Sequence, residues 1–303
     1  MRLDPPLLRG RALPGPVTSP APVGLAVEQW AVLEAWLPGL RVESDHGWGL
    51  TSTVVLEVVH DGRRLVVKAA DPRDGHFPRE ARAHRSWLGP WVEAGRAPRL
   101  LHLDEDARVL VTEFVPGDLV LGGPHELDPD VHRQAGALLA VLHGQDAVVD
   151  DTYWAGEQET TLAWLDRPHR IAPDIAARVR DVVERWDLPP AVLVPTHGDW
   201  QPRNWVLDPG GAVHAIDFGR ADLRPAATDL ARLTAQQFRT RPELEHAFVS
   251  GYGSDPREPG AWRRHLLREA VSTAAWAHQV GDEPFERQGL RMVDEALARV
   301  GVA

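Results

Sequence analysis

Residues 192–229 constrain the fold of this chain more than any other stretch. Within them, the apolar runs WVL and AVHAI are joined by the turn sequence Asp-Pro-Gly-Gly, and neither run has a helical period. Short β-prone runs joined by turn residues predict a β-hairpin over residues 205–216. A hairpin folds the chain back on itself, so Asn204, which precedes the first strand, should lie near Asp217, which follows the second.

Oxygen-bearing side chains collect at the open end of this predicted hairpin. Asp199 lies five residues before Asn204, on the loop that enters the hairpin. Carboxylate and amide oxygens suit a hard cation such as Mg²⁺, which also keeps waters and phosphates in its coordination shell. We therefore expect Asn204 and Asp217 to hold Mg²⁺ beside Asp199.

The order Asp-x-x-x-x-Asn followed by Asp-Phe-Gly is also that of the protein-kinase catalytic loop and metal-binding motif. Here the loop begins with His-Gly-Asp at residues 197–199 rather than His-Arg-Asp. With Asp222 and Asp229 following, the stretch resembles the aminoglycoside phosphotransferase and choline kinase family. The resemblance runs from about Val42 to Leu233. It implies a bilobal kinase-like fold, ATP or GTP with Mg²⁺, and O-phosphorylation of a small molecule.

Two residue types occur only once in the chain, and both fall where a phosphotransferase would need them. Lys68 is the only lysine among 33 basic residues, and Asn204 is the only asparagine. The composition, rich in Ala, Arg, Gly and Pro, is typical of a coding bias that removes Lys and Asn wherever they are replaceable. Arg cannot replace the compact ammonium of Lys, which acts on phosphate as a point charge. Both single residues are therefore candidate site residues.

The first third of the chain predicts a β-rich nucleotide-binding region. The runs TVVLEVV and RRLVVKAA, joined by Asp61-Gly62, predict a hairpin whose second strand carries Lys68. A predicted helix over residues 76–95 follows, in which Glu80 lies twelve residues after Lys68. The resemblance implies that Glu80 holds Lys68 against the α- and β-phosphates, as a strand lysine and a helix glutamate pair in kinases.

The loop before this hairpin, residues 47–53, is rich in small residues. Gly49, Thr51 and Ser52 offer backbone N–H groups and hydroxyls that suit phosphates. The loop is not a Walker A motif, because no Gly-Lys-Ser/Thr follows. Its position directly before the strands that carry Lys68 favours a phosphate-binding role.

Residues 98–116 predict a further hairpin that ends in a connector. Residues 111–115 should form the hinge between two lobes, where Glu113 and Val115 offer backbone groups to an adenine ring. We therefore expect an N-terminal lobe of residues 1–115, with a poorly ordered arm at 1–23, and a C-terminal lobe of residues 116–303 that holds the catalytic loop, the metal site and the acceptor pocket. A β-rich segment followed by a helical one is typical of an α+β protein. Helical periodicity predicts helices within residues 24–37, 128–145, 160–170, 173–186, 227–239, 242–253, 261–279 and 286–300.

Phosphoryl transfer asks a protein mainly to position groups and to neutralise charge. The resemblance implies that Asp199 accepts the proton of the acceptor hydroxyl, or orients the hydroxyl for in-line attack. Asn204 and Asp217 complete the catalytic set by holding the metal ion. His197 is expected to brace the loop by hydrogen bonding.

Five further residues carry expectations about the surroundings of the loop. Asp222 is expected to bond the loop backbone, Asp229 to cap or anchor the helix that follows, and His143 to be structural. Two residues depart from the family's pattern: Arg203 stands where relatives usually carry Gly, and Trp200 makes the loop bulkier. Both are expected to reshape the acceptor side.

Composition limits the partners and the location. The net charge of −11 argues against nucleic acid as the main partner and is compatible with a cationic small molecule. Without cysteine the chain has no disulfides. No apolar run approaches the roughly eighteen residues that span a bilayer. The N-terminus lacks the apolar core of a signal peptide. We therefore expect a cytoplasmic monomer or homodimer without a membrane or nucleic-acid partner.

Three readings of the function stay open from the sequence. The first is a kinase for an aminoglycoside or similar cationic antibiotic. The second is a metabolic kinase for choline, homoserine, an amino sugar or another sugar. The third is a catalytically silent relative that binds nucleotide, and the intact set of Lys68, Glu80, Asp199, Asn204 and Asp217 argues against it. Acidic residues of the second lobe are candidates for a cationic pocket: Asp150, Asp151, Glu157, Glu159, Asp255, Glu258, Glu283 and Glu286.

Overall fold

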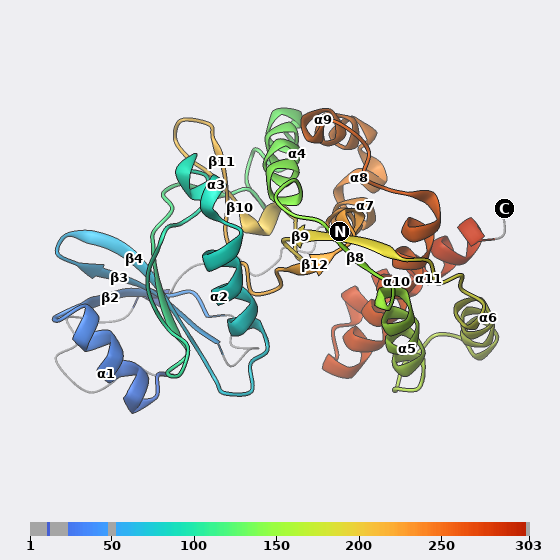
Figure 1. Ribbon diagram of the computed structural model, residues 1–303, viewed down its shortest axis with the longest axis horizontal. Coiled ribbons are helices and arrows are strands. Elements are labelled where there is room, and N and C mark those ends of the chain that lie inside the picture. The colour runs from blue at the N-terminus through green and yellow to red at the C-terminus, as the bar shows by residue number, and fades with distance from the viewer. Residues whose placement is uncertain (1–10, 13–23, 48–52, 301–303) are drawn as a thin grey trace.

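A β-rich N-terminal part and a helical C-terminal part lie side by side in the molecule (Figure 1). The computed structural model describes residues 11–12, 24–47 and 53–300. The predicted α+β class with two lobes is confirmed. The helices are α1 (Val27–Trp36), α2 (His76–Ser86), α3 (Gly89–Glu93), α4 (Pro129–His143), α5 (Tyr153–Leu165), α6 (Pro173–Glu184), α7 (Ala231–Ala235), α8 (Gln237–Thr240), α9 (Pro242–Tyr252), α10 (Pro259–Val280) and α11 (Glu283–Val300), with 3₁₀ turns η1 (Pro202–Asn204) and η2 (Ala226–Leu230).

A six-stranded antiparallel sheet forms the N-terminal part, in the order β1-β2-β3-β4-β6-β5. Its strands are β1 (Arg11–Ala12), β2 (Arg41–Asp45), β3 (Thr53–His60), β4 (Arg63–Ala70), β5 (Leu100–Asp104) and β6 (Val109–Glu113). The β3–β4 and β5–β6 pairs are the two hairpins that the sequence predicts here. Lys68 lies opposite Val55 on one side and Leu110 on the other, so it occupies a central strand.

Two helices cover opposite faces of this sheet, because side chains alternate along each strand. Helix α1 buries Leu33 in one apolar cluster with Val67 of β4. Helix α2 buries Phe77 in another cluster with Ala70 of the same strand. Lys68 shares the parity of Ala70, so the alternation directs its side chain toward α2.

Two small sheets and packed helices form the C-terminal part. Strands β10 (Trp205–Leu207) and β11 (Val213–Ala215) pair antiparallel, which confirms the predicted hairpin over residues 205–216. Strand β7 (Asp118–Leu119) joins β10, while β9 (Ala191–Thr196) lies between β8 (Val148–Asp150) and β12 (Asp222–Arg224). Helix α4 packs on α9 and α10 packs on α11 around these sheets (Figure 1).

Three predicted helices differ from the structure. The helix expected over residues 76–95 is two helices, α2 and α3, which are separated at Trp87 and Leu88. The helix expected over residues 160–170 is α5, which begins earlier, at Tyr153, and ends at Leu165. The segment 227–239 is not one helix but the three short elements η2, α7 and α8. It breaks at Gln236, whose φ of −118° and ψ of −93° are not helical.

Of the predicted N-terminal arm, residues 1–23, the structure describes residues 11–12. Arg11–Ala12 pairs antiparallel with β2, opposite Asp45 and Ser44, while residues 1–10 and 13–23 lie outside the described residues. Among the helices of the described residues, none combines the length and apolar character needed to cross a bilayer.

Candidate active site

Lys68 lies between two carboxylates that come from separate elements. Its Nζ lies 2.6 Å from Glu80 Oε1 on α2 and 3.0 Å from Asp217 Oδ1, and its side chain is 14% exposed. Burial opposes the charge of Lys68, but Asp217 and Glu80 outweigh it and raise its pKa above the ordinary value. The structure therefore brings the strand lysine, the helix glutamate and the Asp-Phe-Gly carboxylate into one contact chain.

Asp217 sits at a sharp turn of the backbone. Its φ of +66° lies in the left-handed region, which residues other than glycine seldom adopt. The preceding Ile216 donates its N–H to the Asn204 carbonyl at 3.0 Å, and its own carbonyl lies 3.1 Å from His197 Nε2. The turn thus joins the end of β11 to the catalytic loop while Asp217 pairs with Lys68. The Lys68 charge also lowers the pKa of Asp217.

The carboxylate of Asp199 is surrounded by donors. Arg232 Nε lies 2.8 Å from Oδ1, Gln201 Nε2 donates to Oδ1 at 2.6 Å, Asn204 Nδ2 donates to Oδ2 at 3.0 Å, and Arg203 also pairs with Oδ2. Burial opposes the charge of Asp199, but Arg232 and Arg203 hold its pKa well below its usual range. Asp199 is therefore ionised at neutral pH and is a weak proton acceptor, better suited to orienting a hydroxyl than to removing its proton early.

Asp229 holds the catalytic loop in place. Its carboxylate accepts hydrogen bonds from His197 N at 2.8 Å and Gly198 N at 2.6 Å, and His143 Nε2 lies 3.1 Å away. The expectation that Asp229 caps or anchors the helix after it is therefore wrong, because both oxygens point to the loop backbone. His143, expected to be structural, completes this clamp and also contacts the Tyr252 hydroxyl at 2.8 Å.

Of the two residues that depart from the family's pattern, Trp200 lies in the core and Arg203 contacts Asp199. The Trp200 side chain is fully buried and packs against Trp91, Trp205 and His197 at ring distances of 5.6, 5.4 and 5.1 Å. The expectation that Trp200 reshapes the acceptor side is wrong, because its indole fills the core behind the loop. Arg203, in contrast, reaches the Asp199 carboxylate.

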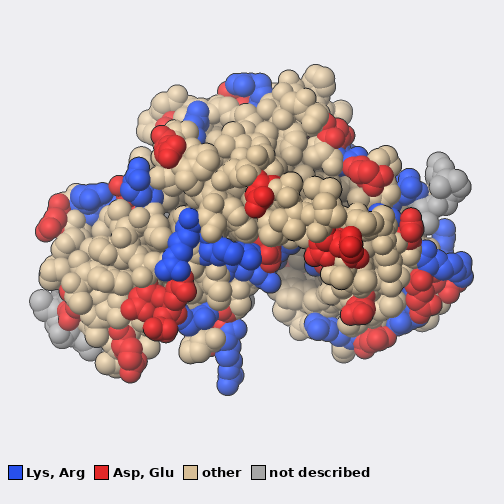
Figure 2. Space-filling model, viewed as in Figure 1, with Lys and Arg blue, Asp and Glu red and all other residues tan. Residues whose placement is uncertain are grey.

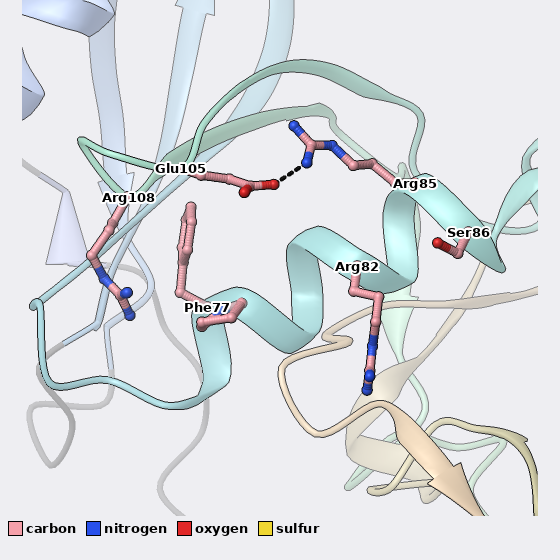
Figure 3. A pocket seen from close by; sticks show the side chains of 7 residues that line it. Phe77, Arg82, Arg85, Ser86, Glu105 and Arg108 are labelled. Atoms are coloured by element: carbon pink, nitrogen blue, oxygen red, sulfur yellow. Dashed lines mark hydrogen bonds and ion pairs between the residues drawn. The ribbon is translucent and has the colours of Figure 1, made fainter.

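A cavity of about 440 Å³ lies beside α2, and its lining includes none of the predicted site residues (Figure 3). Arg85 and Glu105 pair across it, whereas Arg82 points away from that pair and lies 2.5 Å from Asp222 Oδ1. Asp222 was expected to bond the loop backbone through its side chain. Its carboxylate instead ties α2 to β12, and only its carbonyl accepts from Thr196, at 2.7 Å from Oγ1.

The other predicted nucleotide-binding residues lie on two segments. Gly49, Thr51 and Ser52 fall outside the described residues. Glu113 ends β6 with its carboxylate 3.0 Å from Arg63, and Val115 follows in the connector. The roles expected of Glu113 and Val115 concern their backbone groups toward an adenine ring, and they stay predictions.

The acidic residues considered for a cationic acceptor do not form one pocket around Asp199. Glu258 accepts from the first N–H groups of α10, Glu286 lies against Arg170 and His278, and Asp255 pairs with Arg257. Glu157 approaches the site indirectly, because it pairs with Arg268 at 2.7 Å. The eight candidates, Asp150, Asp151, Glu157, Glu159, Asp255, Glu258, Glu283 and Glu286, are spread over β8, α5, the connection from α9 to α10, and α11.

Three residues near Asp199 were missed by the sequence reasoning. Arg232 on α7 contacts Asp199 and lies 3.9 Å from Glu269 Oε1 on α10. Arg220 directly follows Asp-Phe-Gly, and its carbonyl packs on the loop so closely that a Cβ added at Gly198 would lie 2.1 Å from it. The place of Arg220 next to the motif was a usable signal. Arg232 and Glu269 come from helices whose approach to the loop depends on tertiary packing.

Asn204 and Asp217 each keep one oxygen for a metal ion. Asn204 turns Nδ2 toward Asp199, and Lys68 takes Asp217 Oδ1, so Asn204 Oδ1 and Asp217 Oδ2 make no hydrogen bond with the part of the chain that the structure describes. Within that same part, no group of three His, Cys, Asp or Glu side chains is placed to hold a metal. The two free oxygens fit Mg²⁺, which fills its remaining positions with water and phosphate oxygens.

A two-lobed kinase-like fold with this lysine–glutamate pair and Asp-Phe-Gly carboxylate defines a class of enzyme, the phosphotransferases with an alcohol group as acceptor. The chain belongs to the phosphotransferase enzyme family, whose family model matches residues 46–267. Among curated protein sequences, none matches this chain.

Solved structures share the fold at low sequence identity. A thermostable mutant of aminoglycoside phosphotransferase APH(4)-Ia, in a ternary complex with AMP-PNP and hygromycin B, is 13% identical, with 92% of this chain and 100% of that chain covered and a TM-score of 0.68. Choline kinase LicA from Streptococcus pneumoniae is 16% identical, with 90% and 97% covered and a TM-score of 0.61. Spectinomycin phosphotransferase APH(9)-Ia, in complex with ADP and spectinomycin, is 13% identical, with 90% and 98% covered and a TM-score of 0.55.

Proposed function

We propose that this enzyme transfers the γ-phosphate of ATP or GTP to a hydroxyl group of a small molecule with the help of Mg²⁺. The observation that carries the proposal is the contact chain from the buried Glu80 through Lys68 to the exposed Asp217. The Lys68 ammonium, whose pKa is raised by Asp217 and Glu80, lies against the Asp217 carboxylate that also offers an oxygen to Mg²⁺. Related folds with bound AMP-PNP or ADP support a nucleotide as the donor.

Each residue of the site has one task in this proposal. Lys68 contacts the α- and β-phosphates, and the backbone of Glu113 and Val115 receives the adenine ring. Asn204 and Asp217 would hold Mg²⁺, which supplies neutralisation of the charge on the phosphate oxygens when bound.

The transfer itself requires one bond to form and one to break. The acceptor oxygen bonds to the γ-phosphorus while the bond from that phosphorus to the β–γ bridging oxygen breaks, and the nucleoside diphosphate leaves with the bonding electrons. Asp199 orients the hydroxyl toward the γ-phosphorus. Because Arg232 and Arg203 hold its pKa low, the hydroxyl proton passes to Asp199 late, after the bond to phosphorus has made that proton acidic.

The proposal is tested with Asp199→Ala and the isosteric Asp199→Asn. Both variants should bind Mg²⁺–ATP with a Kd close to that of the wild type and should lose about 10³-fold or more in kcat, because the acceptor hydroxyl is no longer oriented. The matched control is Asp181→Asn, on the exposed face of α6. Wild-type turnover in a correctly folded Asp199→Asn variant would remove Asp199 from the mechanism.

The acceptor is identified by a panel that separates the alternatives left by the sequence. ADP release and product mass are measured with aminoglycosides, with choline, ethanolamine and homoserine, and with sugars and amino sugars. A mass gain of one phosphoryl group on one class names the substrate class. Nucleotide binding without transfer to any acceptor would favour a silent relative over a kinase.

A further inference from the structure

Three arginines converge on Asp199 from the helical side of the site, and we name them the acceptor-side arginines: Arg203, Arg220 and Arg232. Arg203 belongs to η1 and Arg232 to α7, and together they engage both oxygens of the Asp199 carboxylate. Arg220 lies beside the loop, because its carbonyl packs against Gly198, and its charge acts on those of Arg203 and Arg232. A site that binds a cationic substrate would be expected to carry acidic side chains here, not a group of arginines.

Arg203 and Arg232 both have carboxylate partners within the protein. Arg203 pairs with Asp199. Arg232 lies on Asp199 and shares Glu269 with Arg268, whose Nη1 lies 3.0 Å from Glu269 Oε2, and Arg268 is in turn paired with Glu157. The Asp217 carboxylate, which pairs with Lys68, adds a further negative charge that acts on Asp199.

Arg220 differs from Arg203 and Arg232 in its partners. It is exposed, and across residues 24–47 and 53–299 no carboxylate lies within ion-pair distance of its guanidinium. Desolvation by the surrounding protein lowers the pKa of Arg220, and the charges of Arg232 and Arg203 lower it further. The charge of Asp199 raises this pKa but does not outweigh them. An exposed guanidinium without a carboxylate is a ready partner for a carboxylate or phosphate.

The acceptor-side arginines lie in the helical part of the molecule, whereas the lysine proposed to bind the nucleotide phosphates lies in the sheet. The chain of pairs runs from Asp199 through Arg232 and Glu269 toward α10 and α5, all within the helical part. Lys68, which serves the nucleotide phosphates in the proposed function, comes from the sheet on the other side. Figure 2 shows a hollow between the two parts of the molecule, with both basic and acidic side chains on its rim.

We propose that the acceptor is an anionic alcohol, a hydroxy compound that carries a carboxylate or phosphate group bound by Arg220. This inference rests on the proposed function and names the substrate class of the same site. Arg203 and Arg232 stay on Asp199, which orients the hydroxyl that is to be phosphorylated. A cationic acceptor would meet repulsion at the same place.

The experiment compares acceptors that differ in charge. The pairs are serine with ethanolamine, glycerol 3-phosphate with glycerol, and glucuronate with glucose and glucosamine; hygromycin B represents the cationic antibiotics. The wild type should show a higher kcat/KM for the member that carries a carboxylate or phosphate group. Arg220→Gln should lower that preference by about 10-fold or more, because a charge-assisted contact is lost, while the KM for ATP stays unchanged. Arg185→Gln, at the exposed C-cap position that follows α6, is the charge-matched control.

The outcomes separate this inference from the function on which it rests. Preferred transfer to glucosamine or hygromycin B, or a preference that Arg220→Gln leaves unchanged, overturns the anionic acceptor but leaves the phosphotransferase reaction standing. Transfer to no acceptor contradicts the proposed function, and calorimetry then decides the inference. Glucuronate and glycerol 3-phosphate are titrated into protein saturated with Mg²⁺ and AMP-PNP. Binding that weakens in Arg220→Gln supports the inference, and binding that is absent or equal in both proteins overturns it.

Discussion

Replacing Asp229 with Asn tests the clamp on which the catalytic loop depends. The carboxylate is fully buried and accepts one hydrogen bond from His197 N and one from Gly198 N, at 2.8 and 2.6 Å. Asn keeps the shape of the side chain but has a single acceptor oxygen, so its NH₂ group faces one of the two backbone donors. One bond is lost and one buried N–H group is left unsatisfied.

The cost of this change can be worked from the lost contacts. A hydrogen bond to a charged group contributes about 1.5–3 kcal/mol, and a buried unsatisfied donor costs a similar amount. The free energy of unfolding of Asp229→Asn should therefore fall by about 3 kcal/mol. For a chain of this size, that corresponds to a Tm lower by roughly 6 °C. Activity should fall as well, because the clamp positions the loop that carries Asp199.

Thermal unfolding followed by circular dichroism measures the effect, with Asp222→Asn as the matched control. The Asp222 side chain is 31% exposed and pairs with Arg82 on the surface of α2, so solvent screening should keep its loss to about 1 kcal/mol or less. If Asp229→Asn unfolds at the wild-type temperature, or is no less stable than Asp222→Asn, the clamp does not stabilise the loop as argued.

The pH dependence gives a second check on Asp229. Burial opposes its charge, but hydrogen bonds from His143 and the loop, with the His143 and His197 charges, lower its pKa in the folded state. A carboxyl with a lowered folded-state pKa stabilises the protein above the pKa of the unfolded chain, near about 3.9, and this contribution is lost as the pH falls through the folded value. The stability difference between wild type and Asp229→Asn should therefore be constant near neutral pH and should narrow below about pH 4. A difference that widens in acid would contradict the assigned direction.

Three further results are expected. Glu80→Gln should raise the KM for ATP by about 10-fold or more, with a smaller effect on the acceptor KM, because Lys68 loses the carboxylate that holds it. An unchanged KM for ATP in steady-state kinetics would show that Lys68 does not need Glu80 to be held in place. Gly198→Ala should lower the free energy of unfolding by about 2 kcal/mol or more in denaturant titrations, because φ is +78° and the new Cβ would meet the Arg220 carbonyl; wild-type stability would refute this. Removing divalent ions with EDTA should abolish transfer, and adding Mg²⁺ back should restore it, whereas full activity in EDTA would exclude the proposed role of Asn204 and Asp217 as metal ligands.

Local sequence determined much of the fold and of the nucleotide side of the site. Alternation along β4 sufficed to place Lys68 on the face that α2 covers, and the Asp-Pro-Gly-Gly turn sufficed to predict the β10–β11 hairpin. Asn204 and Asp217 flank that hairpin, so their proximity follows from the local pairing of its strands. These features depend on short-range rules that are written in neighbouring residues.

The acceptor side depended on long-range packing instead. Arg232 and Glu269 reach the surroundings of Asp199 from α7 and α10, and no periodicity or spacing in the sequence predicts that these helices meet at the loop. The role expected of Asp222 belongs to Asp229 for the same reason, since the direction of a carboxylate depends on which donors lie within reach after folding. The sequence by itself therefore determined the class of chemistry, through residues that are close along the chain. Only the tertiary structure decided the charge that surrounds Asp199, because that charge is assembled from four elements that meet only in the folded protein.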